Sequence, residues 1–407
     1  MKKKYDCVVI GGGPAGTAAA ALLAEGGCDT LLLEREKVPR FHVGESLMPE
    51  TYWIFERLGV LDKMQNSSFV KKVSVQFVSH TGKQSQPFFF KQHDPRESSQ
   101  TWQVERSKFD KMLFDNAAEK GAECCDETRV LDIHFDGQRA TGIRVQTAAG
   151  QSQDIESRVI VDATGQQALM ANRLGLRVDD PTLRKVAIWG YYQNAHRDEG
   201  ENGGATVILQ TNDQKAWFWY IPLSNNITSI GVVGDTDYLL KGRGTPSEVF
   251  LEELEKCENM QGRLQDATLT SEFRVAKEFS YATTQRAGNG WVLTGDAYGF
   301  IDPIYSSGVY FALRTGELAA DAIIEGFQKD DLSAEQLGKW TKEFDQGSLW
   351  IRKLVSAYYS KSFSFGRFLK EHPMHTSNLT DLLIGRIFYD GAGKIFDDMD
   401  PALAKSM

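Results

Sequence analysis

Residues 5–34 read YDCVVIGGGPAGTAAAALLAEGGCDTLLLE, and this stretch decides the fold. The β-branched run at its start and the apolar run at its end are typical of strands buried on both faces. The alanine-rich segment between them predicts a helix, and an acidic residue closes the second strand. This order of elements predicts a βαβ unit that binds a dinucleotide: a strand, a glycine-rich turn, a helix, and a second strand that ends in an acid.

The residues of this unit have separate functions in such a site. Gly11 permits the tight turn, Gly13 lets the backbone approach a pyrophosphate, and Gly16 lets the helix pack closely on the strand. The helix that begins at Pro14–Ala15 offers free N–H groups and a positive dipole end to the phosphates. Glu34 is expected to accept hydrogen bonds from the ribose hydroxyls of an adenosine.

Two later strands indicate which dinucleotide is bound. Residues 158–165 read RVIVDATG and carry Asp162, and residues 291–296 read WVLTGD and end at Gly295 and Asp296. In this order, after a glycine-rich turn, they resemble the FAD-dependent aromatic hydroxylases and their relatives. That resemblance implies that Asp296 holds the ribityl chain of FAD.

The same resemblance implies further contacts with the cofactor. Arg106, in the segment WQVERSKFD, matches a family arginine near the flavin and pyrophosphate, although an ordinary surface charge is the alternative. No second glycine-rich turn in a helical context is visible, so no separate NAD(P)H domain is expected. The expected FAD-binding residues are Gly11, Gly13, Pro14, Ala15, Gly16, Glu34, Arg40, Ser46, Arg106, Asp162, Gly295, Asp296 and Gly308.

The rest of the chain interrupts this nucleotide-binding region. Alternating apolar and polar residues predict strands within residues 72–90, 186–195, 204–211, 216–222 and 228–234, in a mostly antiparallel sheet. We therefore expect an α/β protein with a discontinuous Rossmann-like FAD-binding domain, an inserted substrate-binding sheet and a C-terminal helical region. The expected boundaries are 1–67, 110–180 and 285–330 for the first, 68–109 and 181–284 for the second, and 331–407 for the third.

Two helices are predicted outside the nucleotide-binding unit. Residues 247–260 have the pattern of an exposed amphipathic helix. Helical spacing from residue 333 onward favours a helix that packs on the sheet, with a lid over the substrate as the alternative. Its apolar residues on one face are Leu337, Trp340, Phe344, Leu349, Trp350, Leu354 and Tyr358.

Three elements indicate one reaction class. Residues 217–222 read WFWYIP and match WxWxIP, the signature of flavin-dependent halogenases. The motif FxxPxxSxG of the same family is met within residues 300–308, directly after the Gly-Asp strand. A lysine follows the Gly44–Ser46 segment and begins a strand-like stretch; Lys72 fits best, with Lys71 as the neighbouring possibility. Over about residues 5–330 the chain resembles these halogenases.

This resemblance implies a mechanism with FADH2, O2 and a halide as reactants. Chloride or bromide is oxidised to hypohalous acid at the flavin, and the acid then halogenates a separate substrate. The resemblance assigns halide binding to Ser307 and Gly308, where consecutive backbone amides form an anion site. Lys72 would hold the hypohalous acid by a hydrogen bond or form a haloamine. Trp217 and Trp219 would keep the organic substrate away from the flavin.

One departure narrows the family comparison. Halogenases of free tryptophan carry a glutamate where this chain has Tyr305, so the phenol and pyrrole halogenases are the better match. We expect an electron-rich phenol, pyrrole or indole, free or bound to a carrier protein, and a separate reductase that supplies FADH2. The alternatives are a monooxygenase or reductase of the geranylgeranyl-reductase-like type, or a flavin-binding module without enzyme activity.

Composition excludes some partners. The chain of 407 residues carries a net charge of −9, which argues against nucleic acid as a partner. No apolar run approaches the roughly 18 residues of a membrane span, and no signal peptide is visible, so a cytoplasmic location is expected. The five cysteines lack metal-ligand spacing and are expected to be reduced, and no metal site is expected.

Overall fold

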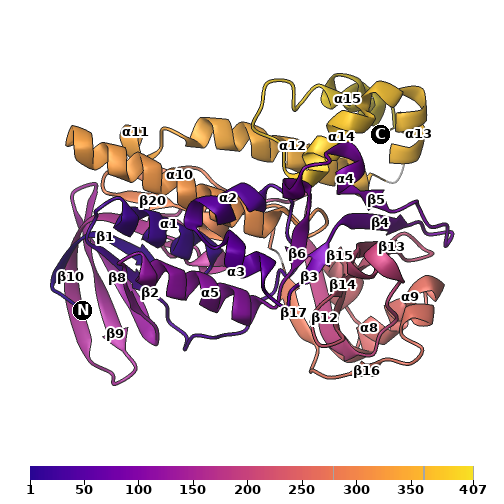
Figure 1. The fold of residues 1–407 in the computed structure, drawn as a ribbon, viewed down its shortest axis with the longest axis horizontal. Coiled ribbons are helices and arrows are strands. Elements are labelled where there is room, and N and C mark those ends of the chain that lie inside the picture. Colours follow the sequence, from indigo (N-terminus) through magenta and orange to yellow (C-terminus); the bar gives the residue numbers. More distant parts are fainter. Residues whose placement is uncertain (278, 361–362, 407) are drawn as a thin grey trace.

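Two large β-sheets lie side by side, and the C-terminal helices cover both along one edge (Figure 1). The computed structural model describes residues 1–277, 279–360 and 363–406, except for the side chains of residues 405 and 406. The first sheet contains the amino terminus and the glycine-rich turn. None of the helices in the described residues is long and apolar enough to span a bilayer.

The first sheet is built around β1 (Lys4–Ile10). This strand pairs in parallel with β2 (Thr30–Leu33) on one side and β10 (Ser152–Asp162) on the other. Next to these, β7 (Glu123–Cys125) and β20 (Trp291–Leu293) extend the parallel order. The predicted Rossmann-like arrangement is thereby confirmed. The carboxyl ends of β1, β2 and β10 therefore lie along one edge of the sheet.

An antiparallel extension flanks these parallel strands. β8 (Thr128–Asp136) and β9 (Arg139–Thr147) continue from β10 as an antiparallel meander, and β19 (Ala287–Gly288) pairs antiparallel with β20. A separate small sheet joins β11 (Arg177–Asp179), β18 (Tyr281–Thr283) and β21 (Gly299–Phe300).

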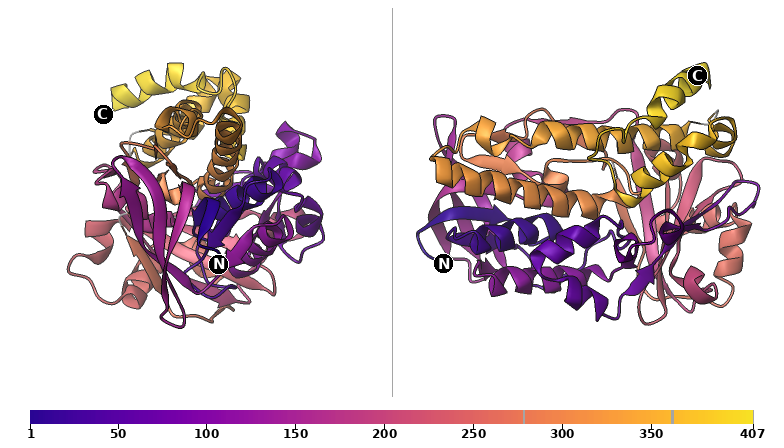
Figure 2. Two further views of the ribbon diagram at one scale, coloured as in Figure 1. Left: turned by 90° about the vertical axis from the view of Figure 1, so that its left-hand side faces the viewer. Right: turned by 45° about the horizontal axis from the view of Figure 1, so that its top comes forward.

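Helices cover the first sheet in a layer. α1 (Pro14–Glu25) lies between α5 (Arg106–Glu119) and the long α10 (Ser307–Lys329), as the two views of Figure 2 show. Position 110, where we expected an FAD-binding segment to begin, lies inside α5. The shorter helices of this part are α2 (Thr51–Leu58), α3 (Leu61–Gln65) and α6 (Leu169–Arg173).

The second sheet is mostly antiparallel, as predicted. Its central strands are β12 (Lys185–Gln193), β15 (Ile227–Asp235), β14 (Ala216–Pro222) and β13 (Thr206–Gln210), in that spatial order. The edges are completed by β4 (Ser74–Val78), β5 (Phe88–Phe89), β16 (Thr268–Leu269) and β17 (Arg274–Lys277).

Strand β14 is buried on both faces. Trp217 and Trp219 belong to the core that continues into the first sheet, whereas Phe218 and Tyr220 belong to a second core behind the sheet. Three helices contribute to that second core, α7 (Thr236–Leu240), α8 (Pro246–Leu254) and α9 (Glu258–Arg263). The single helix expected over residues 247–260 is therefore wrong, because the chain leaves helical geometry between α8 and α9.

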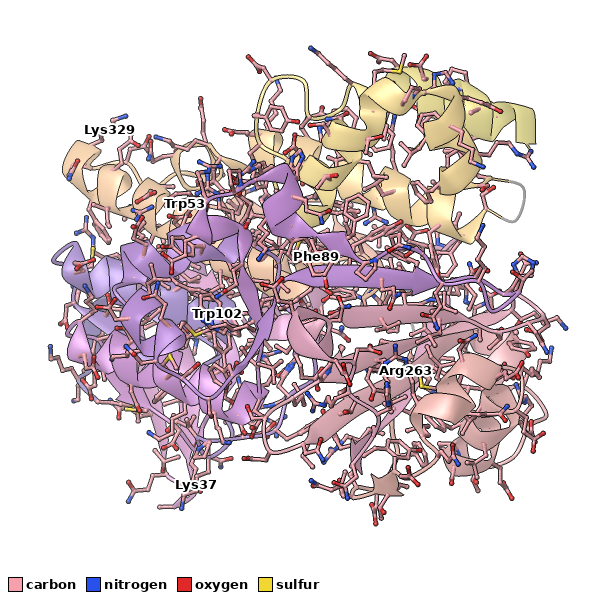
Figure 3. The ribbon with its side chains drawn as sticks, turned by 45° about the vertical axis from the view of Figure 1, so that its right-hand side comes forward. Lys37, Trp53, Phe89, Trp102, Arg263 and Lys329 are labelled. Atoms are coloured by element: carbon pink, nitrogen blue, oxygen red, sulfur yellow. The ribbon has the colours of Figure 1, made fainter. Side chains whose placement is uncertain are left out.

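The strand-like stretch expected at residues 72–90 is divided. β3 (Val70–Lys72) ends at Lys72 and pairs with β6 (Thr101–Gln103) in a two-stranded sheet at the junction of the two large sheets. β4 and β5 follow, and then α4 (Phe90–His93). Lys72 therefore ends a short strand instead of beginning a long one. Figure 3 labels Phe89 on β5, close to the C-terminal helices, and Trp102 on β6.

The C-terminal region is helical, but its first helix is broken. α11 (Ala334–Leu337) ends at Gly338, and α12 (Thr341–Tyr359) follows. Most of the predicted apolar face packs into the core, so the structure supports a packing helix and not a lid. The prediction that Leu349 belongs to this buried face is wrong, because the residue is 41% exposed. The remaining helices are α13 (Phe365–Glu371), α14 (Thr376–Ile384) and α15 (Ile395–Ser406).

Candidate functional site

A deep cavity opens where the carboxyl ends of the parallel strands meet the second sheet. It is lined by residues from the glycine-rich turn, the end of β2, the segment 40–46, the loop after β10, the start of β8, the Gly-Asp turn, the start of α10, and β13 and β14. A ligand is expected at this edge of a parallel α/β sheet. Of the predicted residues, it contains Gly11, Gly13, Pro14, Ala15, Glu34, Arg40, Ser46, Arg106, Trp219, Gly295, Asp296 and Gly308.

The glycine-rich turn has the geometry that a pyrophosphate requires. Gly11 has φ +114°, and a Cβ on Gly16 would lie 1.9 Å from the carbonyl oxygen of Gly11. A Cβ on Gly13 would meet nothing closer than 3.6 Å, so this glycine leaves space that a ligand can use. No acidic residue occupies the first turn of α1, and its free amides suit an anion. The residues present therefore fit the phosphates of FAD.

An ion-pair network lies at the end of the cavity formed by β2 and the segment 40–46. The Oε2 atom of Glu34 accepts hydrogen bonds from the backbone N–H of Gly12 and from Arg40 Nε, each at 3.0 Å. Arg40 also donates to Asp110 at 2.7 Å, and Arg106 donates to the same carboxylate at 2.8 and 3.0 Å. Arg106 is buried, so the surface-charge alternative is wrong.

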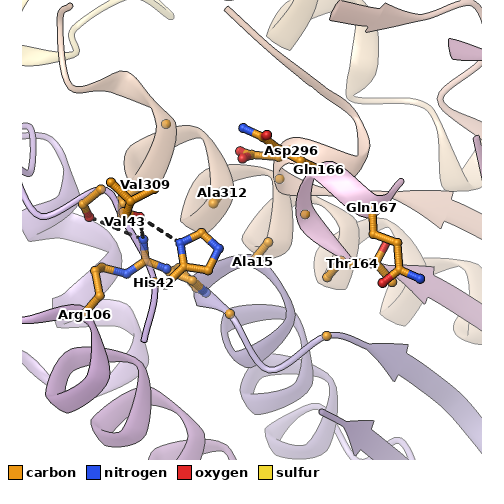
Figure 4. Close-up of a pocket in the computed structure, with 18 of the residues that line it drawn as sticks. Ala15, His42, Val43, Arg106, Thr164, Gln166, Gln167, Asp296, Val309 and Ala312 are labelled. Atoms are coloured by element: carbon orange, nitrogen blue, oxygen red, sulfur yellow. Dashed lines mark hydrogen bonds between the residues drawn. The ribbon is translucent and has the colours of Figure 1, made fainter. Parts of the chain in front are cut away.

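Electrostatics in this network favour the charged carboxylate. Burial by itself would raise the pKa of Asp110, but the Arg106 and Arg40 guanidinium groups hold it below its usual range. In Figure 4, Arg106 points to Val43 at the cavity edge, where the two are hydrogen-bonded. The network therefore holds the segment 40–46 against the cavity.

The two aspartates that follow β10 and β20 differ in position. Asp296 lines the cavity and lies beside Gln166 in Figure 4, and burial raises the pKa of its carboxyl to about 6. Asp162 is not among the cavity-lining residues. Its carboxylate turns inward and accepts the backbone N–H groups of Thr164 at 3.0 Å and Met170 at 2.6 Å. The expected contact between Asp162 and FAD is therefore corrected: this residue shapes the loop that lines the site.

A left-handed residue precedes the first turn of α10. Ser306 has a left-handed backbone conformation (φ +59°), and Ser307 begins the helix. Ser306 and Gly308 line the cavity, whereas Ser307 is buried and lies outside the lining. Phe300 reaches this turn, because a Cβ on Gly308 would lie only 3.0 Å from its ring. Consecutive N–H groups in such a turn suit a small anion.

Lys72 lies close behind the cavity wall without lining it. The residue is 4% exposed, and its ammonium group donates a 2.8 Å hydrogen bond to the backbone carbonyl of Leu47, the residue after the cavity-lining Ser46. The Phe90 ring centre lies 5.8 Å away. Burial without a counter-charge lowers the pKa of Lys72 to about 7. Lys71 is exposed, so the buried position belongs to Lys72.

The two tryptophans of WFWYIP occupy different positions. Trp219 lines the cavity, and its indole N–H donates to Ser229 Oγ at 3.1 Å. Trp217 lies further along the same face of β14, outside the lining, and its ring centre is 6.3 Å from that of Trp219. The structure therefore brings one of the two predicted residues to the cavity and places the other behind it.

Several cavity residues were missed in the sequence. Glu45 accepts a 2.6 Å hydrogen bond from the Tyr191 hydroxyl, and burial raises the pKa of its carboxyl. Ser46 Oγ and Thr206 Oγ1 lie 2.8 Å apart and join the segment 40–46 to the start of β13. The position of Glu45 beside the predicted Ser46 is a signal that could have identified it. Thr206 carries no such signal, since its contact is formed only by the fold.

Comparisons with known proteins agree with this geometry. Residues 4–319 match the family model described as an FAD binding domain. The chain is 30% identical to the 1H-pyrrole-2-carbonyl-(peptidyl-carrier protein) chlorinase of Pseudomonas fluorescens, over 98% of this chain and 93% of that protein. It is 32% identical to the corresponding brominase of Pseudoalteromonas luteoviolacea, over 81% and 79%. The solved structure of the flavin-dependent brominase Bmp2 superimposes with a TM-score of 0.89 at 27% identity, over 99% of this chain and 100% of that one.

Proposed function

Because this chain belongs to the flavin-dependent halogenases, we propose that Lys72 transfers oxidised halogen to a pyrrole ring carried on a peptidyl-carrier protein. The chain is an FAD-dependent oxidoreductase that uses O2 and a halide to halogenate an electron-rich aromatic compound. This assignment is favoured over the reductase or monooxygenase alternative. The observation that carries the proposal is the buried Lys72 beside the cavity, whose nitrogen is hydrogen-bonded to the Leu47 carbonyl and to no carboxylate among the described residues.

The halide is held at the turn that begins α10. When bound, reduced FAD would give two electrons to O2 and the halide would give two more, so that O2 yields one molecule of hypohalous acid and one of water. The backbone amides of Ser307 and Gly308 attract the halide, because they lie at a helix N-terminus after a left-handed residue. Glycine at 308 lets Phe300 cover the turn, which excludes water from the anion.

Lys72 receives the hypohalous acid as a free amine. A new N–X bond forms as the O–X bond breaks, and water leaves with the second amine proton. The ring carbon then attacks the halogen, the N–X bond breaks, and the ring proton returns to the lysine nitrogen. Burial favours the neutral amine that this sequence needs, and among the described residues no carboxylate is ion-paired with Lys72.

The tryptophans separate oxidation from substitution. Trp219 faces the cavity, and Trp217 continues the aromatic layer along β14. An organic ring therefore cannot approach the flavin along this face of the sheet, whereas a small hypohalous acid molecule can leave it. This arrangement suppresses direct hydroxylation.

The substrate and the electron source complete the proposal. This chain aligns with most of the length of two halogenases that act on pyrrole bound to a carrier protein. That similarity supports a carrier-bound pyrrole as the substrate. The sequence has no second glycine-rich dinucleotide turn, which supports a separate flavin reductase as the source of FADH2.

The test supplies a flavin reductase, NADH, FAD, O2 and bromide to the purified protein. Pyrrole-2-carbonyl bound to a carrier protein is compared with free pyrrole-2-carboxylate and with a panel of phenols, and products are identified by mass spectrometry. We expect bromination of the carrier-bound pyrrole and little of the free acid. Bromination confined to the phenols would overturn the substrate assignment. Hydroxylated or reduced products alone would overturn the halogenase mechanism.

A further inference from the structure

A chain of three hydrogen bonds joins the turn at residues 300–308 to the tryptophan strand. The backbone N–H of Ile304 donates to Asp302 Oδ1 at 2.9 Å. The Tyr359 hydroxyl donates to Asp302 Oδ2 at 3.0 Å, and the indole N–H of Trp217 donates to the Tyr359 oxygen at 2.9 Å. We call residues 300–308 the halide turn and β14 the tryptophan strand. Their connection therefore runs through the last residue of α12.

The polar groups of these three hydrogen bonds have few other partners available to them. Asp302 is 1% exposed, so its carboxylate depends on protein donors for its hydrogen bonds. The Tyr359 hydroxyl donates its one proton in a hydrogen bond to Asp302, and its oxygen accepts a hydrogen bond from the indole N–H of Trp217. Lys185 covers the Tyr359 ring, with its nitrogen 3.9 Å from the ring centre, and pairs with Asp235 at 2.6 Å.

The end of α12 contacts the halide turn at a second point. The Tyr305 hydroxyl donates to the backbone carbonyl of Leu354 at 3.2 Å. Within the turn, the N–H of Ser306 donates to the carbonyl of Pro303 at 3.1 Å. The residues before the proposed halide amides are thus braced both internally and by α12. A shift of this helix end would move the turn and the tryptophan strand together.

We propose that Asp302 and Tyr359 are positioning residues that hold the halide turn and Trp217 in register. The proposal rests on the proposed roles of Ser307, Gly308 and the tryptophans. Its consequence is that halide affinity and retention of hypohalous acid depend on α12, which contributes nothing to the cavity lining. The family resemblance in the sequence covered residues up to about 330, so it gave no indication of this dependence.

The neighbouring tyrosine provides a matched control. Tyr358 occupies the same helix end, and its ring packs at 6.2 Å from Trp217 and at 6.5 Å from Tyr305, contacts that phenylalanine keeps. Its buried hydroxyl lies near Gln210 and does not bond to Asp302 or Trp217. Tyr359→Phe and Tyr358→Phe each remove one oxygen from adjacent positions. Only the first removes the hydrogen bonds to Asp302 and Trp217.

The experiment first measures the protein without turnover. Amide hydrogen exchange of residues 216–222 and 300–308 is followed by mass spectrometry, and halide binding by the 35Cl NMR line width of the FAD-loaded protein. Tyr359→Phe is expected to accelerate exchange in both segments and to weaken chloride binding about tenfold, which is part of the effect of losing two buried hydrogen bonds. Tyr358→Phe is expected to match the wild type in both measurements.

Turnover then separates positioning from general stability. In Tyr359→Phe the KM for bromide and the H2O2 released per flavin oxidised should rise, while FAD affinity stays unchanged. Asp302→Asn in the Tyr359→Phe background should add little to either effect, because the shared bond is already lost. If Tyr359→Phe does not fold, Asp302→Asn is compared with Tyr358→Phe by the same criteria.

Two results overturn the inference. One is halide binding and peroxide release in Tyr359→Phe that equal those of Tyr358→Phe. The other is faster amide exchange without a change in halide binding, which reduces the hydrogen bonds to a structural role. A wild-type protein that binds chloride but forms no halogenated product would overturn the proposed function, and the exchange and chloride measurements would still decide this inference.

Discussion

The indole ring of Trp219 lies directly on the backbone of Gly231, its partner across β14 and β15. A Cβ on Gly231 would be 2.2 Å from Cζ2 of that ring. Because Trp219 also lines the flavin cavity, a glycine on the neighbouring strand sets the shape of the cofactor site.

Gly231→Ala should therefore push the Trp219 ring into the cavity. Overpacking of this kind costs about 1–3 kcal/mol, and we expect the dissociation constant of FAD to rise about tenfold. Quenching of flavin fluorescence during titration measures it. Gly262→Ala is the control, since a Cβ there meets nothing within 4 Å. Equal FAD affinity in the two variants would contradict this account of Trp219.

Alanine substitutions at two glycines of the phosphate turn should affect different properties of the protein. Gly13→Ala should fold normally but lose FAD affinity, because its Cβ enters space left for the pyrophosphate. Gly16→Ala should lower the thermal midpoint of the protein without FAD, because its Cβ collides with the carbonyl of Gly11. Calorimetry and flavin titration on both variants test this pair. A Gly13→Ala protein with wild-type FAD affinity would show that the phosphates bind elsewhere.

Lys72→Ala should abolish halogenation while FAD binding stays intact. A positioned reactive group contributes about 10²- to 10⁴-fold, so product should fall at least about a hundredfold. Lys72→Arg should fail as well, because a guanidinium stays charged and cannot form the N–X bond. Lys71→Ala, one residue away and exposed, is the matched control. Full halogenation by Lys72→Ala would remove this lysine from the mechanism.

The rate of ring halogenation should rise with pH around neutrality. Burial lowers the pKa of Lys72 to about 7, so the free amine becomes the main form above that pH. Single-turnover measurements with added hypobromous acid isolate this step from the flavin chemistry. If the rate falls as pH rises through 7, the ammonium form of Lys72, and not the free amine, carries out the halogen transfer.

The free energy of unfolding should also depend on pH through Lys72. The folded pKa of Lys72, about 7, lies below its unfolded value of 10.5, so the unfolded chain binds more protons between these limits. The stability contribution of Lys72 therefore rises with pH across this window. Lys72→Met should be more stable than the wild type at pH 7, and the difference should shrink towards pH 10. Urea unfolding at several pH values measures it, and a constant difference would contradict the lowered pKa.

The sequence was informative where local pattern and burial coincide. The strand expected at residues 216–222 is β14 with the same limits, because every residue of it is apolar and buried. The glycine-rich turn was equally clear, since its geometry depends on the glycines themselves. Asp162 was misleading for a physical reason: an acid after a buried strand can serve either a ligand or the backbone of its own loop, and here it serves the loop.

Contacts between distant residues could not be predicted in this way. The hydroxyl pair of Ser46 and Thr206 joins residues 160 positions apart, and the bond between Trp217 and Tyr359 spans 142 positions. The break at Gly338 was also hidden, because Leu337 and Trp340 on either side of it both face the core. Periodicity records which side of an element is buried, but not what it meets.

The hydrogen bond between Trp217 and Tyr359 also has a consequence for biosynthesis. A ribosome releases the chain from its amino terminus, so all cavity-lining residues up to Ala312 have been made before residue 359 is added. A growing chain therefore contains every residue that lines the cavity while the indole N–H of Trp217 still lacks its partner. The order of translation makes this anchor of the tryptophan strand one of the last contacts that the chain can form.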